Sequence, residues 1–301
     1  MADILIPTVA QGLMWALMAL GVYITFRVLD IADLSVEGSF PLGAAVAATA
    51  LVSGYGVTAA FLLAAVAGAL AGIVTGILTT KLKIPPLLAG ILTMIGLYSV
   101  NLHVMGKANV ALLRVDTVFS YAAGMGLTSD MAMMAVGLVG VVLVGVLLYW
   151  FFGTELGCSL RATGANQHMA RAQGINTNVT IVLGLMVSNG LVALAGALLS
   201  QYQGFSDINM GRGAIVIGLA AVIIGEVLFG KLCAGKHFAF AYTMFSVIGG
   251  AIIYYIVMNI VLWLKLPSDD LKLFSAIVVA IFLAFPYLKS KYGRKGVSVN
   301  G

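Results

Sequence analysis

The chain has 301 residues, of which 61% are hydrophobic and 9% charged, and its mean hydropathy is +1.09. A soluble domain carries about 25% charged residues, so the composition excludes a soluble fold. It predicts an all-α polytopic membrane protein with a single transmembrane domain over 1–301. The net charge of +5 is then expected to report orientation in the lipid bilayer rather than binding to nucleic acid.

Nine apolar segments follow one another along the chain, and a membrane-spanning helix needs roughly 20 apolar residues. They run over about 8–28, 39–54, 57–79, 86–105, 131–152, 178–200, 213–229, 238–263 and 271–288. Two of them, 39–54 and 213–229, are short and rich in Gly and Ala, so each is a full span, a broken helix or a re-entrant segment. We therefore expect about 8–10 transmembrane or re-entrant helices.

The two short segments are similar in size and composition, which is typical of internal symmetry around a pathway at the middle of the membrane. Irregular backbone at that depth is tolerated only where protein or a water-filled cavity covers it. The long segment 238–263 has room for a further break near Gly249 and Gly250. Gly/Ala composition alone can produce the similarity, so ordinary spans remain an alternative.

Small residues recur every four positions in the third segment, at Gly68, Gly72 and Gly76. This spacing places them on one helix face, where a second helix can approach closely in lipid. We expect that face to pack within the molecule, and a dimer interface is the alternative.

Lys and Arg residues set the orientation of the spans, because cytoplasmic loops carry an excess of both. With the polar loop 153–177 inside, the inner side holds 11 of the 16 and the outer side 5. The inner set is Arg27, Lys81, Lys83, Arg161, Arg171, Lys231, Lys236, Lys289, Lys291, Arg294 and Lys295, and the outer set is Lys107, Arg114, Arg212, Lys265 and Lys272. The C-terminal tail 289–301 is then cytoplasmic, and the N-terminus is external if there are nine spans.

The loop 106–130 is external in this arrangement. It is partly amphipathic and predicts a short helix on the outer surface, where a solute-binding protein could dock.

The polar loop 153–177 has the signals of two short helices. The first is expected over Leu156 to Thr163 and to stop at Gly164. Asn166 is a good N-cap for a second helix over 167–173, which Gly174 closes, and Thr177 can cap the next span. A flexible linker needs neither caps nor stops, so the loop predicts a knob that fits a groove on a partner. A solvated loop whose arginines only set the topology is the alternative.

The loop carries the order T-E-L-G-x-x-x-R-A-x-G-x-N-x-x-x-A-x-x-x-G-I-N over 154–176. This order resembles the coupling loop of ABC importer permeases of the branched-chain amino acid and ribose type, and most of all permeases labelled as tryptophan or tyrosine transport components. The stretches 29–44 and 193–213 extend the resemblance to about residues 8–288. The positions that match the segment docking in the ATPase are Glu155, Gly157, Arg161, Ala162, Gly164, Asn166, Ala170, Gly174 and Ile175.

The resemblance implies a type II-like ABC importer permease in a bacterial cell membrane, which carries a small solute by alternating access. An amino acid is the expected solute, with an aromatic or branched side chain. The implied partners are two ATPase subunits that hold ATP and Mg²⁺, a second copy or close paralogue of the permease, and an extracellular solute-binding protein. This chain is then a transport subunit and not an enzyme, and it binds no cofactor or metal itself.

The candidates for a substrate pathway are the polar residues within spans, namely Glu37, Ser39, Asn101 and Asn189. Glu37 and Ser39 belong to a cluster with Asp30, Asp33 and Ser35. The alternatives are helix capping at the membrane edge for the cluster and helix-to-helix hydrogen bonds for the two amides.

Glu226 follows an apolar run, and a carboxylate inside a membrane is costly unless it is paired. We expect it near the cytoplasmic end, paired with Lys231 or Lys236. A substrate or proton role is the alternative.

Motifs of other protein classes are absent from the sequence. It lacks the phosphate-binding G-x-x-x-x-G-K-[ST], as well as H-E-x-x-H and G-x-S-x-G, and His103, His168 and His237 form no metal-ligand set. An ion-coupled secondary transporter remains a rival, with thin support from Glu226 and the cluster at 30–37, and an intramembrane enzyme is a weaker one.

Overall fold

The computed structural model describes residues 2–113, 115–126, 128–233, 239–263, 273–274, 276–282 and 284. The predicted tail 289–301 lies outside these residues, as do Arg114, Lys236, His237, Lys265 and Lys272, and the predicted segment 271–288 is described only in part.

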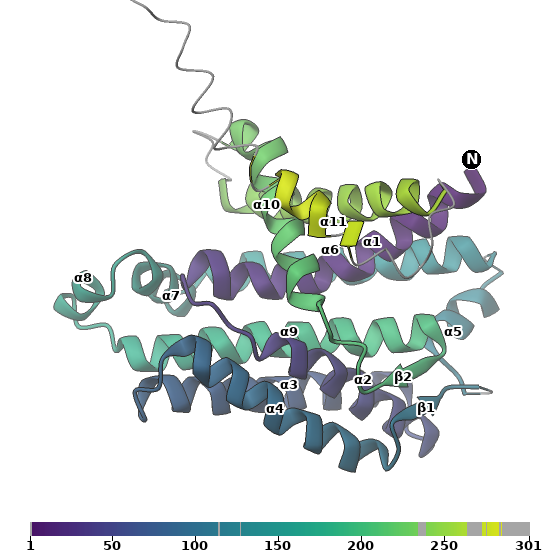
Figure 1. Cartoon of the computed structure of the whole chain (residues 1–301), viewed down its shortest axis with the longest axis horizontal. Helices are drawn as coiled ribbons and strands as arrows, with labels where there is room; N and C mark the ends of the chain where they lie inside the picture. The colour runs from purple at the N-terminus through teal and green to yellow at the C-terminus, as the bar shows by residue number, and fades with distance from the viewer. Residues whose placement is uncertain are drawn as a thin grey trace, which may run out of the picture.

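The described residues form helices with one small sheet (Figure 1). In chain order the elements are α1 (Ala2–Tyr23), the π-helix η1 (Ile24–Val28), α2 (Val36–Val52), α3 (Val57–Thr80), α4 (Pro86–Met105), β1 (Asn109–Ala111), α5 (Val118–Gly124), α6 (Ser129–Gly153), α7 (Glu155–Ala165), α8 (Gln167–Ala172), α9 (Thr177–Gln203), β2 (Phe205–Asp207), α10 (Ala214–Cys233) and α11 (Ala239–Trp263).

The helices agree closely with the predicted apolar segments. Among the described residues, six helices are long and apolar enough to cross a membrane, and Val36–Val52 and Ala214–Phe229 are shorter apolar helices. The prediction of a break near Gly249 and Gly250 is wrong, because α11 is continuous there. Both glycines serve packing instead, and a Cβ added at Gly250 would lie 2.0 Å from the carbonyl oxygen of Ala221 in α10.

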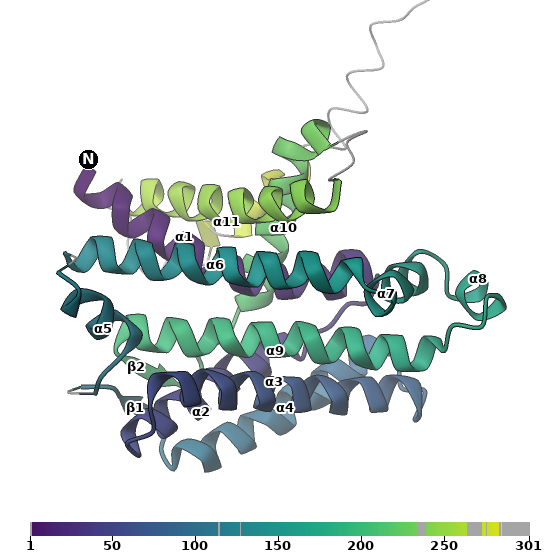
Figure 2. The same cartoon turned by 180° about the vertical axis from the view of Figure 1, so that it is seen from behind.

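The long helices lie roughly side by side, with different structures at their two ends (Figures 1 and 2). The N-terminus, α5 and the two strands lie at one end, and α7 and α8 project from the other. Strands β1 and β2 pair antiparallel, with Val110 opposite Ser206. The loop 106–130 contains the expected short helix, α5, which begins at a capping box between Thr117 and Ser120. The described N-terminal end of α1 thus lies opposite the α7–α8 end.

Helix α9 is the centre of one half of the bundle, where it packs against α2 and α3. Small residues make this approach possible. A Cβ added at Gly72 would lie 2.2 Å from the carbonyl oxygen of Leu185, and one at Gly68 would lie 2.4 Å from that of Asn189. A Cβ added at Gly43 of α2 would lie 1.9 Å from the carbonyl oxygen of Ala193. The glycine face of α3 therefore packs within the molecule, as expected.

The chain turns back into the bundle after η1. Val28 and Leu29 lie at the α7 end, whereas α2 begins beside Asn189, near the middle of α9. Residues 29–35 cover the distance without a regular helix. From there α2 continues to the end with the strands, since Phe40 contacts Gly196 further along α9. Helix α2 is thus a shorter apolar helix of 17 residues that starts inside the protein.

Helix α10 also starts inside the bundle, and it leads the opposite way. Residues 208–213 return from β2 into the bundle, where the backbone N–H of Gly213 donates to Oε1 of Glu37 at 3.1 Å. Helix α10 then leads towards the α7 end of α1, with Gly218 against Val22 and Glu226 beside Arg27. The N-termini of α2 and α10 therefore meet inside the bundle.

Substitution of Gly72 with Val tests the packing of α3 on α9. The added side chain would force apart two backbones, and overpacking typically costs 1–3 kcal/mol or more, so we expect a lower thermal unfolding temperature in detergent. Gly145→Val is the matched control, because a Cβ at Gly145 of α6 meets nothing within 4 Å. Equal unfolding temperatures for the two variants would contradict this account of α9.

Candidate functional site

A buried polar network holds the start of α2 against α9. Oδ1 of Asp33 accepts from the backbone N–H of Ser35 at 2.9 Å and from its hydroxyl at 2.5 Å. Oδ2 of Asp33 accepts from Nδ2 of Asn189 at 2.9 Å. The hydroxyl of Ser39 donates to Oδ1 of Asn189 at 2.5 Å. Asp33 is 3% exposed and Ser35, Ser39 and Asn189 are 0% exposed, so this network excludes solvent.

The interpretation of this cluster as a set of groups at the membrane edge is therefore wrong for Asp33. A buried carboxylate is expensive unless hydrogen bonds replace its water, and its three donors supply that replacement. Side-chain capping of α2 is not confirmed, because its N-cap residue Ser35 makes no side-chain cap hydrogen bond to the helix. Asp33 instead accepts from the backbone N–H of Ser35 itself. Asp30 differs, since it is exposed.

A cavity of about 370 Å³ lies next to this network, between α2, α4 and the segment 208–212. It is lined by Glu37, Gly38, Pro41, Met94, Ile95, Tyr98, Ser99, Asn101, Ile208, Asn209 and Arg212. Cavities of this size suit small solutes. Charged and amide groups line one part of it, and apolar side chains of α4 line another.

Glu37 and Asn101 give this cavity its polar character. Glu37 is in the first turn of α2 and accepts from Gly213 at the start of α10, so it lies at the positive ends of two helix dipoles. Asn101 is 1% exposed, and its Nδ2 donates to the carbonyl of Gly38 at 3.3 Å. Within the described residues, Oδ1 of Asn101 has no hydrogen-bond partner.

The four pathway candidates thus separate into two places. Ser39 and Asn189 belong to the buried network, whereas Glu37 and Asn101 line the cavity. Arg212 and Tyr98 also line the cavity, and the sequence did not single them out. Tyr98 and Arg212 are far from Glu37 along the chain, so no sequence pattern links the three residues. The fold brings α4 and segment 208–212 beside the start of α2.

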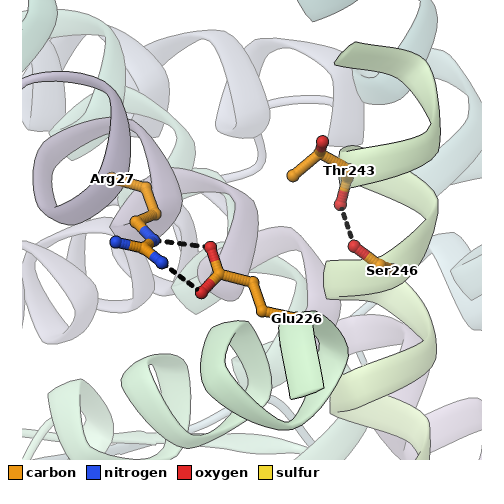
Figure 3. Close-up of polar contacts among 4 residues, drawn as sticks. All are labelled: Arg27, Glu226, Thr243 and Ser246. Carbon is orange, nitrogen blue, oxygen red and sulfur yellow. Dashed lines mark hydrogen bonds and ion pairs between the residues drawn. The ribbon is translucent and has the colours of Figure 1, made fainter. Parts of the chain in front are cut away.

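Glu226 forms an ion pair with Arg27 (Figure 3). Nε of Arg27 donates to Oε1 at 2.5 Å and an Nη donates to Oε2 at 2.6 Å, a two-pronged pairing. The partner of Glu226 is therefore an arginine 199 positions away, and not one of the two predicted lysines. The side chain of Lys231 and all of Lys236 lie outside the described residues. Nearby, Ser246 donates to the carbonyl of Thr243 within α11.

The polar loop 153–177 contains two helices, α7 and α8, as expected. Asn166 caps α8 by accepting from the N–H of Met169 at 3.0 Å, and Gly174 ends it with φ +84°. Two details differ. Helix α7 runs through Gly164 to Ala165, so this glycine is not a stop, and Asn176 rather than Thr177 caps α9.

Gly164 instead lets α7 contact the end of η1. A Cβ there would lie 1.7 Å from the carbonyl oxygen of Val28. Gly157 allows a similar backbone contact between α7 and the end of α6, because a Cβ there would lie 2.4 Å from the carbonyl oxygen of Phe151. Helix α7 is thus in backbone contact with two membrane helices.

Side chains connect α7 to further helices. An Nη of Arg161 donates to the carbonyl of Phe152 at 3.0 Å, and its guanidinium lies 5.7 Å from the ring of Phe240 in α11. The hydroxyls of Thr163 and Thr180 share a hydrogen bond of 2.8 Å, which ties α7 to α9.

Three further residues of the predicted coupling segment, Glu155, Ala162 and Asn166, lie on the outer surface of α7 and α8 and are exposed. Ala170 is 3% exposed and packs inward. Leu156 and Met169 expose 55% and 59% of their surface. Exposed apolar side chains on a projecting, polar segment are typical of a protein–protein contact.

Among the described residues, six helices can cross a membrane, and two further apolar helices begin side by side inside the bundle. Helices that begin at such a depth are typical of a solute pathway. Together these features define a multi-pass membrane transport protein. The chain belongs to the family described as branched-chain amino acid transport system / permease component, whose model matches residues 4–286. It is accordingly a permease of the ABC transport class and a transport subunit rather than an enzyme.

Individual relatives agree with this family. The tyrosine transport system permease protein of Clostridioides difficile is 41% identical over 280 residues, which cover 93% of this chain and 90% of the relative. An uncharacterized protein of Rickettsia prowazekii is 35% identical, covering 94% and 97%. The autoinducer 2 import system permease protein of Yersinia pseudotuberculosis is 27% identical, covering 84% and 68%. No solved structure matches the chain significantly.

Asn189→Leu tests the buried network. The substitution keeps the volume but removes one of the three donors to Asp33 and the acceptor of Ser39. The loss of a hydrogen bond to a buried charged group costs about 1.5–3 kcal/mol. We expect a clearly lower unfolding temperature in detergent. Asn259→Leu is the control, because within the described part of the chain the Asn259 amide hydrogen-bonds only to the carbonyl of Tyr255 in its own helix, and it should cost about 1 kcal/mol. An Asn189 variant as stable as this control would exclude a structural role for the network.

Charge reversal tests the pair between Arg27 and Glu226. Arg27→Glu and Glu226→Arg should each destabilise the protein, and the double variant should recover most of the loss. The gain from the pair is expected to be about 1 kcal/mol, because the side chains are 53% and 27% exposed. A double-mutant cycle on unfolding temperatures measures the coupling, and purely additive losses would show that the two groups act independently.

Proposed function

We propose that this chain is the membrane-spanning subunit of an ATP-driven importer for an amino acid, and that separate ATPase subunits bind α7 and α8. ATP and Mg²⁺ are then held by those partners and not by this chain. The α7–α8 end is cytoplasmic in a bacterial cell membrane, and so is the C-terminal tail. Arg27, Lys81, Lys83, Arg161 and Arg171 all belong to that end, which agrees with the positive-inside rule.

The docking of α7 is the observation that carries this proposal. Backbone contacts at Gly157 and Gly164 and side-chain contacts at Arg161 and Thr163 join α7 to α6, η1, α11 and α9. A force on α7 is therefore passed to the ends of several membrane helices at once. A loop that only set topology would need no such contacts.

The mechanism follows from this geometry. When ATP closes the ATPase subunits, the coupling helices move with them, and α7 displaces the ends of α1, α6 and α9. Because packed helices shift as units, the bundle tilts and the pathway changes the side to which it opens. Two copies of the chain, or this chain and a close paralogue, enclose the pathway between them.

The opposite end is suited to an extracellular solute-binding protein. Helix α5 and the β1–β2 sheet form a small structured surface there. One relative favours an aromatic amino acid as the substrate, because the protein from Clostridioides difficile is named for tyrosine transport. The family also favours this importer over the ion-coupled transporter and the intramembrane enzyme.

Gly164→Val tests the coupling. Any Cβ at this position overlaps the carbonyl of Val28, so α7 must move away from η1. We expect the permease to fold and to bind its ATPase, with ATP hydrolysis continuing while uptake of labelled L-tyrosine into proteoliposomes falls by about tenfold or more. Gly153→Val is the control, since a Cβ at Gly153 meets nothing within 4 Å.

Co-purification with the ATPase supplies the second readout. Deletion of α8 or substitution of the exposed Met169 with Glu should weaken this association without unfolding the membrane domain. Uptake by the purified chain alone, independent of ATP, would overturn the proposed function. Normal coupled transport by the Gly164 variant would overturn the role given to α7.

A further inference from the structure

The cavity beside the start of α2 contains two opposite charges that do not neutralise each other. Glu37 and Arg212 both line it, yet among the described residues they form no ion pair with each other or with a third group. Glu37 is half-buried, and Arg212 is exposed at its rim. Ionisable residues within a membrane bundle are costly and usually face a pathway. The separated charges therefore leave room for a molecule that carries both signs.

The negative part of the cavity consists of hydrogen-bond acceptors. Oδ1 of Asn101 is buried and unpaired within the described residues. The other amide group, Nδ2, is committed to the carbonyl of Gly38, so rotating the amide would face two oxygens towards each other. Pro41 has no N–H to donate to the carbonyl of Glu37. Acceptors without donors are what an ammonium group needs, because it brings three donors and no acceptor.

The rest of the cavity suits a carboxylate and a side chain. Arg212 presents a guanidinium, which binds carboxylates with two parallel hydrogen bonds. Met94, Ile95 and Tyr98 of α4 provide an apolar wall, and Tyr98 is 48% exposed. The volume of about 370 Å³ accommodates one amino acid.

We propose that this cavity binds the zwitterionic backbone of an aromatic amino acid, with its ammonium group at Glu37 and Asn101 and its carboxylate at Arg212. The site rests on the proposed function and extends it, since it names where the solute binds within the permease. Its position at the meeting point of α2 and α10 couples it to the helices that the ATPases move. Specificity then belongs partly to this chain and not only to the solute-binding protein.

The test is equilibrium binding of labelled L-tyrosine to the purified full-length permease in lipid nanodiscs. Tyramine, which lacks the carboxylate, and hydroxyphenylpropionate, which lacks the ammonium group, serve as competitors. Arg212→Gln should weaken L-tyrosine binding about tenfold and leave tyramine unchanged. Glu37→Gln and Asn101→Leu should weaken both amines and leave hydroxyphenylpropionate unchanged. Arg212→Lys should restore part of the L-tyrosine binding.

Lys107→Gln is the matched control for the loss of one positive charge at the same end, and it should bind all three compounds like the original chain. A variant that had merely lost its structure would bind none of them, so the ligand-specific pattern separates recognition from stability. The proposal is overturned if L-tyrosine does not bind, or if the Arg212 and Asn101 variants bind it normally.

ATP-driven uptake separates this inference from the proposed function. Coupled uptake that persists unchanged in the Glu37, Asn101 and Arg212 variants would overturn the site and leave the importer intact. Selective binding of L-tyrosine without any ATP-driven uptake would overturn the importer and leave the site intact.

Discussion

The hydrogen bonds of the Asp33 carboxylate position the start of α2 and, through it, the cavity and the beginning of α10. They fix a non-helical stretch of chain beside Asn189, inside a bundle where unpaired backbone groups are expensive. Because α2 starts there, Glu37 reaches the beginning of α10 and the cavity forms between α2 and α4. The break in the helix is thus stabilised by a satisfied polar network rather than tolerated as a defect.

The same region connects the two ends of the molecule. Helix α7 rests on Val28 through Gly164, and only a few residues separate Val28 from Asp33 along the chain. A displacement of α7 therefore has a short route to the start of α2. Close packing of α9 against α2 and α3 gives this route a rigid support, since backbones in contact cannot slide past one another without moving together.

Much of the fold could be predicted from the sequence, because long apolar runs, glycine spacing and cap residues are local signals. The bounds of α3 and α4, the packing face at Gly68 and the cap at Asn166 all followed from them. The errors arose where a local signal has two physical causes. Gly164 has the properties of a helix stop, yet its missing Cβ serves contact with η1, and only the neighbouring helix distinguishes the two.

A bundle of membrane helices with a structured polar loop and two short apolar segments could be predicted from the amino-acid sequence alone. Hydropathy and helix capping depend on residues that are neighbours in the chain, so both can be recognised without a tertiary structure. The partners of the polar groups become visible in the folded protein: Asp33 bonds to Asn189, Arg27 pairs with Glu226, and Glu37, Asn101 and Arg212 line one cavity. These partners are 64 to 199 positions apart, and the pairing of charges across such distances is set by helix packing, which no local pattern encodes.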